Sequence, residues 1–215
     1  MATPRGWAAA KQHVMVFGQV FHVKLFSSSD ESKDSDMQIR TLYVDGRIKE
    51  FTTGEPHDVT DKTFVVRRVY RINDALPEES KTPPKWKWQR GGWLLVDRIT
   101  GRVSNAVLPD FDPFYSAASW YEDYAAYCGI SGNAENAFAV VVQLGNRKPL
   151  IRKPIGAAKG GNEPESECPP PVWDRNPARV TFTLAHDDKL SFDIHGRAAE
   201  MQTDDAGKQP RDRKP

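Results

Sequence analysis

Residues 91–153 read GGWLLVDRITGRVSNAVLPDFDPFYSAASWYEDYAAYCGISGNAENAFAVVVQLGNRKPLIRK, and they decide the fold. The first run in this stretch, residues 93–97, is apolar and rich in β-forming side chains. Asp97 and Gly101 favour a turn, because aspartate accepts hydrogen bonds from backbone N–H groups ahead of it and glycine adopts left-handed conformations without strain. Residues 102–108 then return, so the pattern predicts an antiparallel hairpin.

The second half of this stretch repeats the scheme. Residues 124–130 are apolar and are followed by Ser-Gly-Asn at residues 131–133. Residues 138–144 (FAVVVQL) are the strongest strand run in the chain, and their nearly continuous apolar character predicts burial on both faces of a sheet. A turn at Gly145 then leads to a short returning strand at residues 149–152.

The rest of the chain shows the same alternation of strands and tight turns. Asp45-Gly46 lies between β-rich flanks at residues 39–51, which favours a hairpin with a type I′ turn. Residues 178–184 and 189–195 alternate apolar and polar side chains, which predicts a half-buried hairpin around His186-Asp187. We therefore predict an all-β single domain of antiparallel hairpins with little helix, arranged as a sandwich, a barrel or a small propeller-like meander.

Three further segments give a strand, a loop and an undecided prediction. Residues 14–25 alternate along their whole length and predict one long strand, with the set that begins at Met15 and Phe17 buried. Residues 52–62 contain glycine and proline and predict a loop. Residues 115–123 allow either two turns of helix or an extended approach to the next strand, and the sequence leaves both alternatives open.

Length and charge limit the function. A chain of 215 residues predicts one domain, here an N-terminal strand and polar linker (1–36), a β domain (37–200) and a disordered charged tail (201–215). The 30 basic and 29 acidic residues leave a net charge of +1, so we expect no nucleic-acid partner. No apolar run reaches the roughly 18 residues that span a bilayer, so we expect no transmembrane segment.

The two cysteines bear on the compartment. Cys128 lies in a predicted strand and Cys168 in a proline-flanked loop, and two isolated cysteines do not make a structural zinc site. They are either unrelated thiols or a disulfide, and a disulfide would imply an oxidising compartment. Because the N-terminus shows no clear signal peptide, we expect an exported or periplasmic protein only if the two are bonded.

Two resemblances accompany these patterns. A strand ending in Asp97, a Thr-Gly turn, a short return and then the run WYEDYAAY resemble the seam between two β-propeller blades, over residues 93–153. The phrases TGEPHDVTDKTF, WKWQRGGWLLVDRITGR, LPDFDPFYSAASWYEDYAAYCGIS and QLGNRKP resemble a family of uncharacterised bacterial proteins of unknown function, over most of residues 45–197. The second resemblance implies no catalytic residues.

An acidic and aromatic segment, residues 109–124, is the candidate ligand-binding site. Aromatic faces can stack on sugars or peptides, whereas a calcium loop of the EF-hand kind would need more oxygen ligands at fixed spacing and a glycine at its turn. The opposing interpretation is a structural loop whose aromatic rings cap the core. The candidate residues are Asp110, Phe111, Asp112, Phe114, Tyr115, Trp120, Tyr121, Glu122 and Asp123.

Local catalytic motifs are absent from the sequence. It contains no HExxH, no GxSxG elbow, no P-loop and no dinucleotide-binding fingerprint. We therefore predict a non-enzymatic β-module that binds a protein or glycan partner through its aromatic loop, without catalytic residues, metal or cofactor. One alternative is a hydrolase or metal-dependent enzyme using Asp110, Asp112, Glu122 and Asp123, and another is a structural subunit that assembles through open sheet edges.

Overall fold

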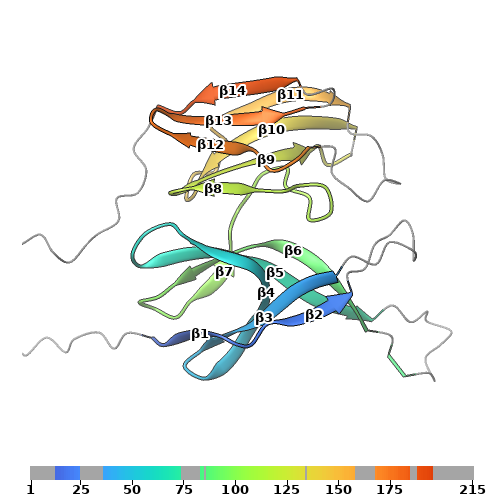
Figure 1. Ribbon diagram of the computed structural model, residues 1–215, viewed down its shortest axis with the longest axis vertical. Helices are drawn as coiled ribbons and strands as arrows, with labels where there is room; N and C mark the ends of the chain where they lie inside the picture. The colour runs from blue at the N-terminus through green and yellow to red at the C-terminus, as the bar shows by residue number, and fades with distance from the viewer. Residues whose placement is uncertain are drawn as a thin grey trace, which may run out of the picture.

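The computed structural model describes residues 13–24, 36–73, 83–84, 86–133, 135–157, 168–184 and 188–195. These residues form three antiparallel sheets and no helix, and none of the sheets closes into a barrel, so the expected all-β class is confirmed. A seven-stranded sheet forms one half of the molecule, and a sandwich of a four-stranded and a three-stranded sheet forms the other (Figure 1). We call them the sheet half (residues 13–105) and the sandwich half (residues 106–195).

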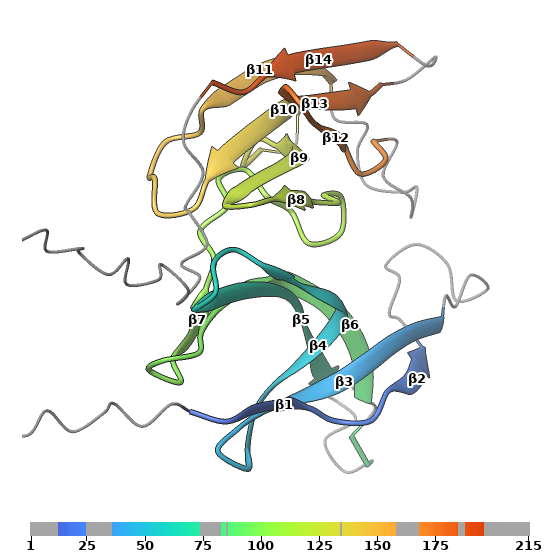
Figure 2. The same cartoon turned by 60° about the vertical axis from the view of Figure 1, so that its left-hand side comes forward.

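The sheet half has the order β1-β3-β4-β5-β6-β7, with β2 also paired to β3. The sheet curls strongly, so that its strands wrap around their own apolar side chains (Figure 2). Leu42, Phe64, Val66, Leu94 and Val96 form the centre of this core. The strands are β1 (Met15–Phe17), β2 (Phe21–Lys24), β3 (Asp36–Val44), β4 (Arg47–Asp58), β5 (Thr63–Asn73), β6 (Trp86–Asp97) and β7 (Val103–Asn105).

Both predicted turns of the sheet half are confirmed. Asp45 and Gly46 have φ angles of 50° and 73°, the two positive values that a type I′ turn requires. Between β6 and β7, the Asp97 Oδ1 atom accepts a hydrogen bond of 3.0 Å from the Thr100 N–H, and Gly101 has a φ of 67°. The local chemistry of these few residues therefore fixes two chain reversals.

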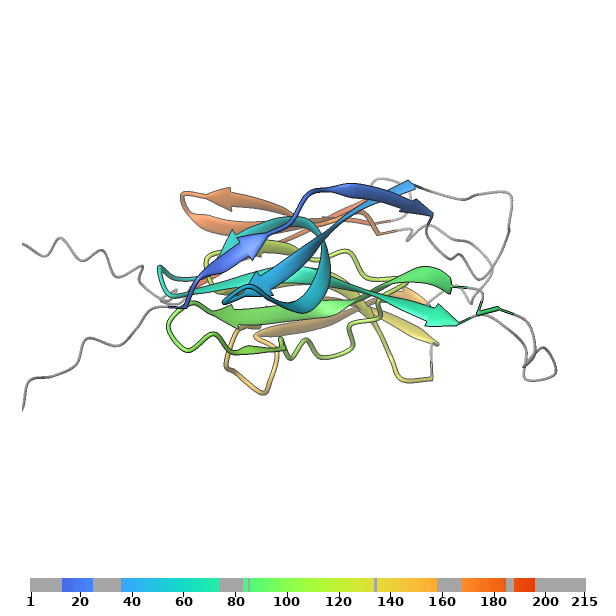
Figure 3. The same cartoon turned by 90° about the horizontal axis from the view of Figure 1, so that it is seen from below.

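The expectation of one strand over residues 14–25 is wrong. The Gly18 N–H bonds to the Thr41 carbonyl at 2.8 Å, and a Cβ atom on Gly18 would lie 3.1 Å from the Tyr43 ring. This close approach separates β1 from β2, which both pair with β3 on the side away from the sandwich half (Figures 1 and 3). Met15 still packs on the core, as expected.

The loop expected over residues 52–62 is also wrong in its first half. Strand β4 continues to Asp58, and a register shift between Thr53 and His57 absorbs the intervening glycine and proline. A bulge of this kind bends a strand and redirects its side chains. Here it brings Gly54 and Glu55 to the edge of the cleft described below.

The two central strands of the four-stranded sheet, β9 and β10, are buried on both faces. On β10 every residue from Ala137 to Val142 is buried, as the apolar run predicted. Val140 belongs to a cluster with Tyr127, whereas Val141 belongs to a cluster with Phe182 of the opposing sheet. The strands are β8 (Ser119–Tyr121), β9 (Tyr124–Ile130), β10 (Asn136–Gln143) and β11 (Ile151–Ala157), facing β12 (Val172–Arg175), β13 (Ala178–Thr183) and β14 (Lys189–Asp193).

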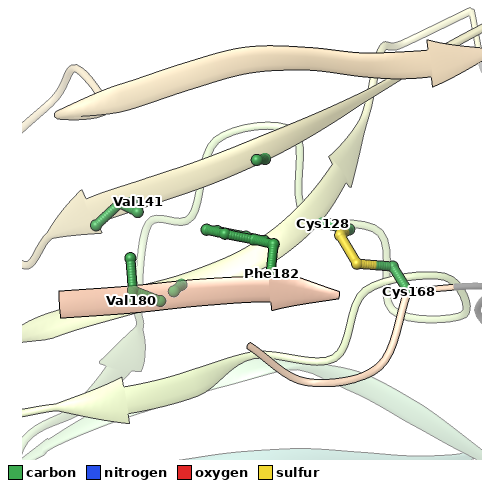
Figure 4. Packing of buried hydrophobic residues seen from close by; sticks show 7 residues of the cluster. Cys128, Val141, Cys168, Val180 and Phe182 are labelled. Carbon is green, nitrogen blue, oxygen red and sulfur yellow. A yellow bond between two sulfur atoms is a disulfide. The ribbon is translucent and has the colours of Figure 1, made fainter. Parts of the chain in front are cut away.

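A disulfide joins the two sheets of the sandwich. Cys128 on β9 is bonded to Cys168, which precedes β12, and the two Cα atoms are 6.2 Å apart. Figure 4 shows the bridge beside Phe182, with Val141 and Val180 further along the same core. Of the two interpretations that the sequence left open, the structure has the bonded one.

The remaining predictions concern residues 115–123 and the strands of the C-terminal sheet. Residues 115–123 form turns and the short strand β8, so the extended alternative holds and the helix does not. Strand β12 was not anticipated, because its four residues lie between a proline-rich run and a turn. Strands β13 and β14 pair as predicted, although their turn at residues 185–187 lies outside the described residues, as does the tail at 201–215.

Candidate functional site

The carboxylates of the candidate segment do not converge. The Asp110 Oδ2 atom pairs with the Arg152 guanidinium at 2.7 Å, at the four-stranded sheet's edge. Asp123 is 5% exposed, and its Oδ2 atom accepts a hydrogen bond of 2.9 Å from the Gln143 amide. Among the described residues, no group of three or more His, Cys, Asp or Glu side chains is arranged to hold a metal ion.

Asp112 organises a tight turn. Its Oδ1 atom accepts hydrogen bonds from the backbone N–H groups of Phe114 (2.8 Å) and Tyr115 (2.9 Å). Its own N–H donates to the Ser116 Oγ atom at 3.0 Å, so both ends of the turn are held. As a result Phe114 stands at the surface with 52% of its area exposed, while Tyr115 packs against the sandwich core.

Most of the aromatic side chains of the segment contribute to packing. Phe111 meets the Tyr127 ring edge-on at a centroid distance of 5.3 Å. Tyr121 stacks on Trp173 of β12 at 5.5 Å, and burial is the main cause that raises the pKa of the Tyr121 hydroxyl. Phe111 packs against the buried cluster that includes Tyr127, whereas Phe114 is the large apolar side chain of the segment that remains exposed.

Trp120 and Glu122 form the joint between the two halves. The Trp120 ring lies 5.2 Å from Trp93 of β6 and stacks on His57 of β4 at 6.0 Å. The His57 Nε2 atom donates a hydrogen bond of 2.8 Å to the Glu122 carbonyl. Glu122 has a φ of 50°, at the turn between β8 and β9. At Trp120 and Glu122 the joint therefore consists of aromatic contacts and the His57 hydrogen bond.

An open cleft of about 580 Å³ lies beside this joint. One wall belongs to β4, β5 and β6, and the other consists of residues 113–118 with the segment that follows the disulfide. This volume lies within the usual range for ligand sites, about 300–1,000 Å³. The lining residues are Thr53, Gly54, Glu55, Arg67, Arg90, Trp93, Pro113, Phe114, Tyr115, Ser116, Ala117, Ala118, Cys168, Pro169 and Pro170.

Arg67 lies in the inner wall of the cleft and is 9% exposed. Its Nη2 atom donates to the Pro113 carbonyl at 2.8 Å and its Nη1 atom to the Ser116 carbonyl at 3.4 Å. The guanidinium carbon also lies 4.9 Å from the centre of the Phe111 ring and 5.9 Å from that of Trp93. Its Nε atom is buried without a hydrogen-bond partner in the described structure. Arg67 thus clamps the loop of one half onto a strand of the other.

The cleft carries two cations in close proximity. Burial, and secondly the charge of Arg90, lower the pKa of Arg67 to about 10, and Asp112 offsets part of this shift. Arg90 is exposed, and its guanidinium makes no ion pair or hydrogen bond with any other described residue. Glu55 also lines the cleft, but its carboxylate pairs with Arg40 at 2.9 Å.

Only some of the residues that line the cleft were among the candidates predicted from the sequence. Phe114 and Tyr115 were candidates and line the cleft, whereas Arg67, Arg90 and Trp93 line it and were not candidates. The available signal was the position of Arg67 directly after the apolar run at residues 64–66, on the same strand face as Val65 and Val69, because a charged residue among apolar ones must find partners or face a cavity. No model of a known protein family, no curated protein sequence and no solved structure matches this chain.

Proposed function

We propose that the protein is a non-catalytic binding module that holds a protein or glycan partner in the cleft between the two halves. The observation that carries this proposal is the open cleft of about 580 Å³. Phe114 is exposed on one side of it, and Tyr115 and Trp93 line its walls. Aromatic side chains that are held in place and still accessible are common anchors of binding interfaces.

The structure narrows the binding segment that the sequence suggested. Within residues 109–124, the carboxylates of Asp110 and Asp123 are paired to side chains, and that of Asp112 holds a turn. Residues 113–118 face the cleft. This arrangement supports a binding role for the short turn and a scaffold role for the rest of the segment.

A pair of variants tests the proposal. Phe114→Ala removes an exposed ring, so we expect an unchanged melting temperature. For a ligand found on glycan and peptide arrays, we expect Kd to rise about 30-fold, equivalent to about 2 kcal/mol. Val107→Ala is the matched control, because Val107 is 71% exposed and does not line the cleft.

Two outcomes would contradict the proposal. One is a set of array ligands whose affinities are the same for wild type and Phe114→Ala. The other is a loss of thermal stability in Phe114→Ala with unchanged affinity for the remaining folded protein, which would make Phe114 a packing residue. Binding and melting should therefore be measured on the same preparations.

An open sheet edge favours assembly as a second candidate function. Strand β7 pairs only with residues 94–96 of β6, so on the side of β6 away from β5 the described structure pairs no strand with residues 86–92. An open edge can pair with a strand of another chain. Sedimentation of the wild type over a hundredfold concentration range tests this candidate, and a constant monomer mass would exclude it.

A further inference from the structure

The cleft has positive charge that no side chain of its own neutralises. Arg67 is bound to two carbonyl oxygens and two aromatic faces rather than to a carboxylate. Buried ions in proteins are normally paired, because an uncompensated charge loses its hydration without replacement. The carbonyl groups satisfy part of the hydrogen bonding of this guanidinium but leave its full positive charge in place.

Arg90 adds a second positive charge whose guanidinium is accessible. It lines the same cleft, it is exposed, and its guanidinium has no bonding partner among the described residues. A guanidinium presents a planar fork of N–H donors that matches a carboxylate in two-point geometry. Arg90 is therefore suited to direct contact with an anion, whereas Arg67, whose Nε atom is covered, contributes through its charge.

The nearby acidic side chains are already engaged. Glu55 at the cleft pairs with Arg40, and Asp112 holds the turn that carries Phe114. The negative charge of Asp112 raises the pKa of Arg67, but the two side chains make no ion pair in the described structure. An anion that enters the cleft would meet two guanidinium groups without competing for either of them with a bound carboxylate.

We infer that the cleft binds an acidic oligosaccharide, with a uronic-acid carboxylate on Arg90 and a sugar ring against the face of Phe114. This inference rests on the proposed binding function and names its ligand class. An apolar sugar face can lie on an aromatic ring while the carboxylate of the same sugar reaches a guanidinium. The cleft offers both groups on its lining, and its volume of about 580 Å³ is suited to a short oligosaccharide.

A glycan suits this lining better than an acidic peptide. A bound peptide must satisfy its own backbone N–H and C=O groups, usually by pairing with exposed backbone of its receptor. Three lining residues, Pro113, Pro169 and Pro170, have no N–H to offer, and the Gly54 carbonyl already accepts a bond of 2.8 Å from Arg40. Sugar hydroxyl groups donate as well as accept, so they are less dependent on receptor N–H groups.

Calorimetric titration with three probes tests the inference. The probes are trigalacturonate, its fully methyl-esterified form, which keeps the rings and removes the charge, and triglutamate, which keeps the charge on a peptide. We expect trigalacturonate to bind at least tenfold more tightly than either of the others. We also expect its Kd to rise several-fold between 0.05 and 0.5 M NaCl, because salt screens an exposed ion pair.

Matched arginine variants locate the charge effect. Arg90→Gln should raise Kd for trigalacturonate at least tenfold, and Arg90→Lys should restore part of the affinity, because it keeps the charge without the planar fork. Arg47→Gln changes the net charge equally at an exposed position outside the cleft lining, and it should leave Kd unchanged. An equal effect of Arg47→Gln and Arg90→Gln would overturn the inference.

The remaining outcomes separate this inference from the proposed function. Equal binding of trigalacturonate and its methyl ester would overturn the acidic-ligand inference while leaving a glycan-binding cleft intact. Preferential binding of triglutamate would overturn the glycan choice and leave a protein-binding cleft. If none of the three probes binds, the inference fails, and the Phe114→Ala comparison on arrays decides the proposed function independently.

Discussion

The two halves of this protein stabilise their cores in different ways. The sheet half curls around branched aliphatic side chains and has no disulfide among its described residues. The sandwich half packs two sheets around small residues such as Ala126 and Ala139 and the fully buried ring of Phe182, and adds the Cys128–Cys168 bond. Each of the four buried apolar clusters in the described structure lies within one half.

This difference explains where the cleft lies. The halves meet through aromatic rings, the His57 bond to the Glu122 carbonyl and the Arg67 clamp, rather than through a shared apolar core. Such a joint leaves room for a cleft that residues of both halves line. We therefore expect a mutation in the core of one half to leave the stability of the other half largely unchanged.

Removal of the disulfide should have the largest effect. Its cysteines are 40 residues apart in sequence, for which loop-closure entropy gives about 4 kcal/mol of stabilisation. Cys128→Ala/Cys168→Ala should lose about that amount in the sandwich half, measured by hydrogen exchange of β9, β10 and β13, while exchange in β3–β6 stays near the wild-type rate. A uniform increase of exchange in both halves would show that they unfold as one unit.

Leu94→Ala is the corresponding test of the sheet half. Leu94 is 1% exposed and packs with Val66 and Val96, so truncation should cost about 3 kcal/mol through lost burial and the cavity left behind. Hydrogen exchange should now accelerate in β3–β6 and stay slow in β9 and β10. Val107→Ala, at a 71% exposed position, serves as the control and should leave both halves unchanged.

The joint itself should have an intermediate effect. Arg67→Met keeps much of the side-chain volume but leaves the Pro113 and Ser116 carbonyls without their donor, which should cost about 2 kcal/mol. The increased exchange should centre on residues 113–118 and spread little into either core. Arg90→Met, which removes no described bond, should have a melting temperature close to wild type.

Arg67→Met could also raise the melting temperature, and this result would change the role assigned to Arg67. Apolar replacement of a buried charge can stabilise a protein when desolvation of the charge costs more than its bonds return. A higher melting temperature for Arg67→Met would mean that Arg67 is retained against a stability cost. The clamp would then be secondary to the positive charge that it places in the cleft.

The sequence predicted those features that depend on neighbouring residues. Asp45-Gly46 and the turn after Asp97 follow from local backbone chemistry, and the apolar run of β10 follows from burial on two faces. The cleft could not be found in this way, because Arg67 and Pro113 are 46 positions apart and meet only when the halves pack. The bulge after Thr53, which brings Glu55 to the cleft, likewise depends on pairing with β5.

The smallest effects concern one carboxylate in each half. Backbone hydrogen bonding from Thr100 is the main cause that lowers the pKa of Asp97 below its ordinary 3.8, and a hydrogen bond from Arg179 lowers that of Asp193. A carboxyl group whose pKa is lower in the folded state stabilises the protein above its unfolded pKa. That stabilisation is lost as the pH falls from about 4 through the folded pKa.

Asp97→Asn and Asp193→Asn distinguish the two carboxylates. Asp97 holds two backbone N–H groups at the β6–β7 turn, so we expect Asp97→Asn to cost about 1 kcal/mol at pH 7 in either low or high salt. Asp193 pairs with an arginine while 43% of its side chain stays exposed, so Asp193→Asn should cost less, and nothing measurable in 1 M NaCl. Urea unfolding of both variants at pH 7 and pH 3 measures these differences, which should shrink at pH 3. If 1 M NaCl abolishes the cost of Asp97→Asn as well, the turn is held by general electrostatic attraction rather than by the two directed hydrogen bonds.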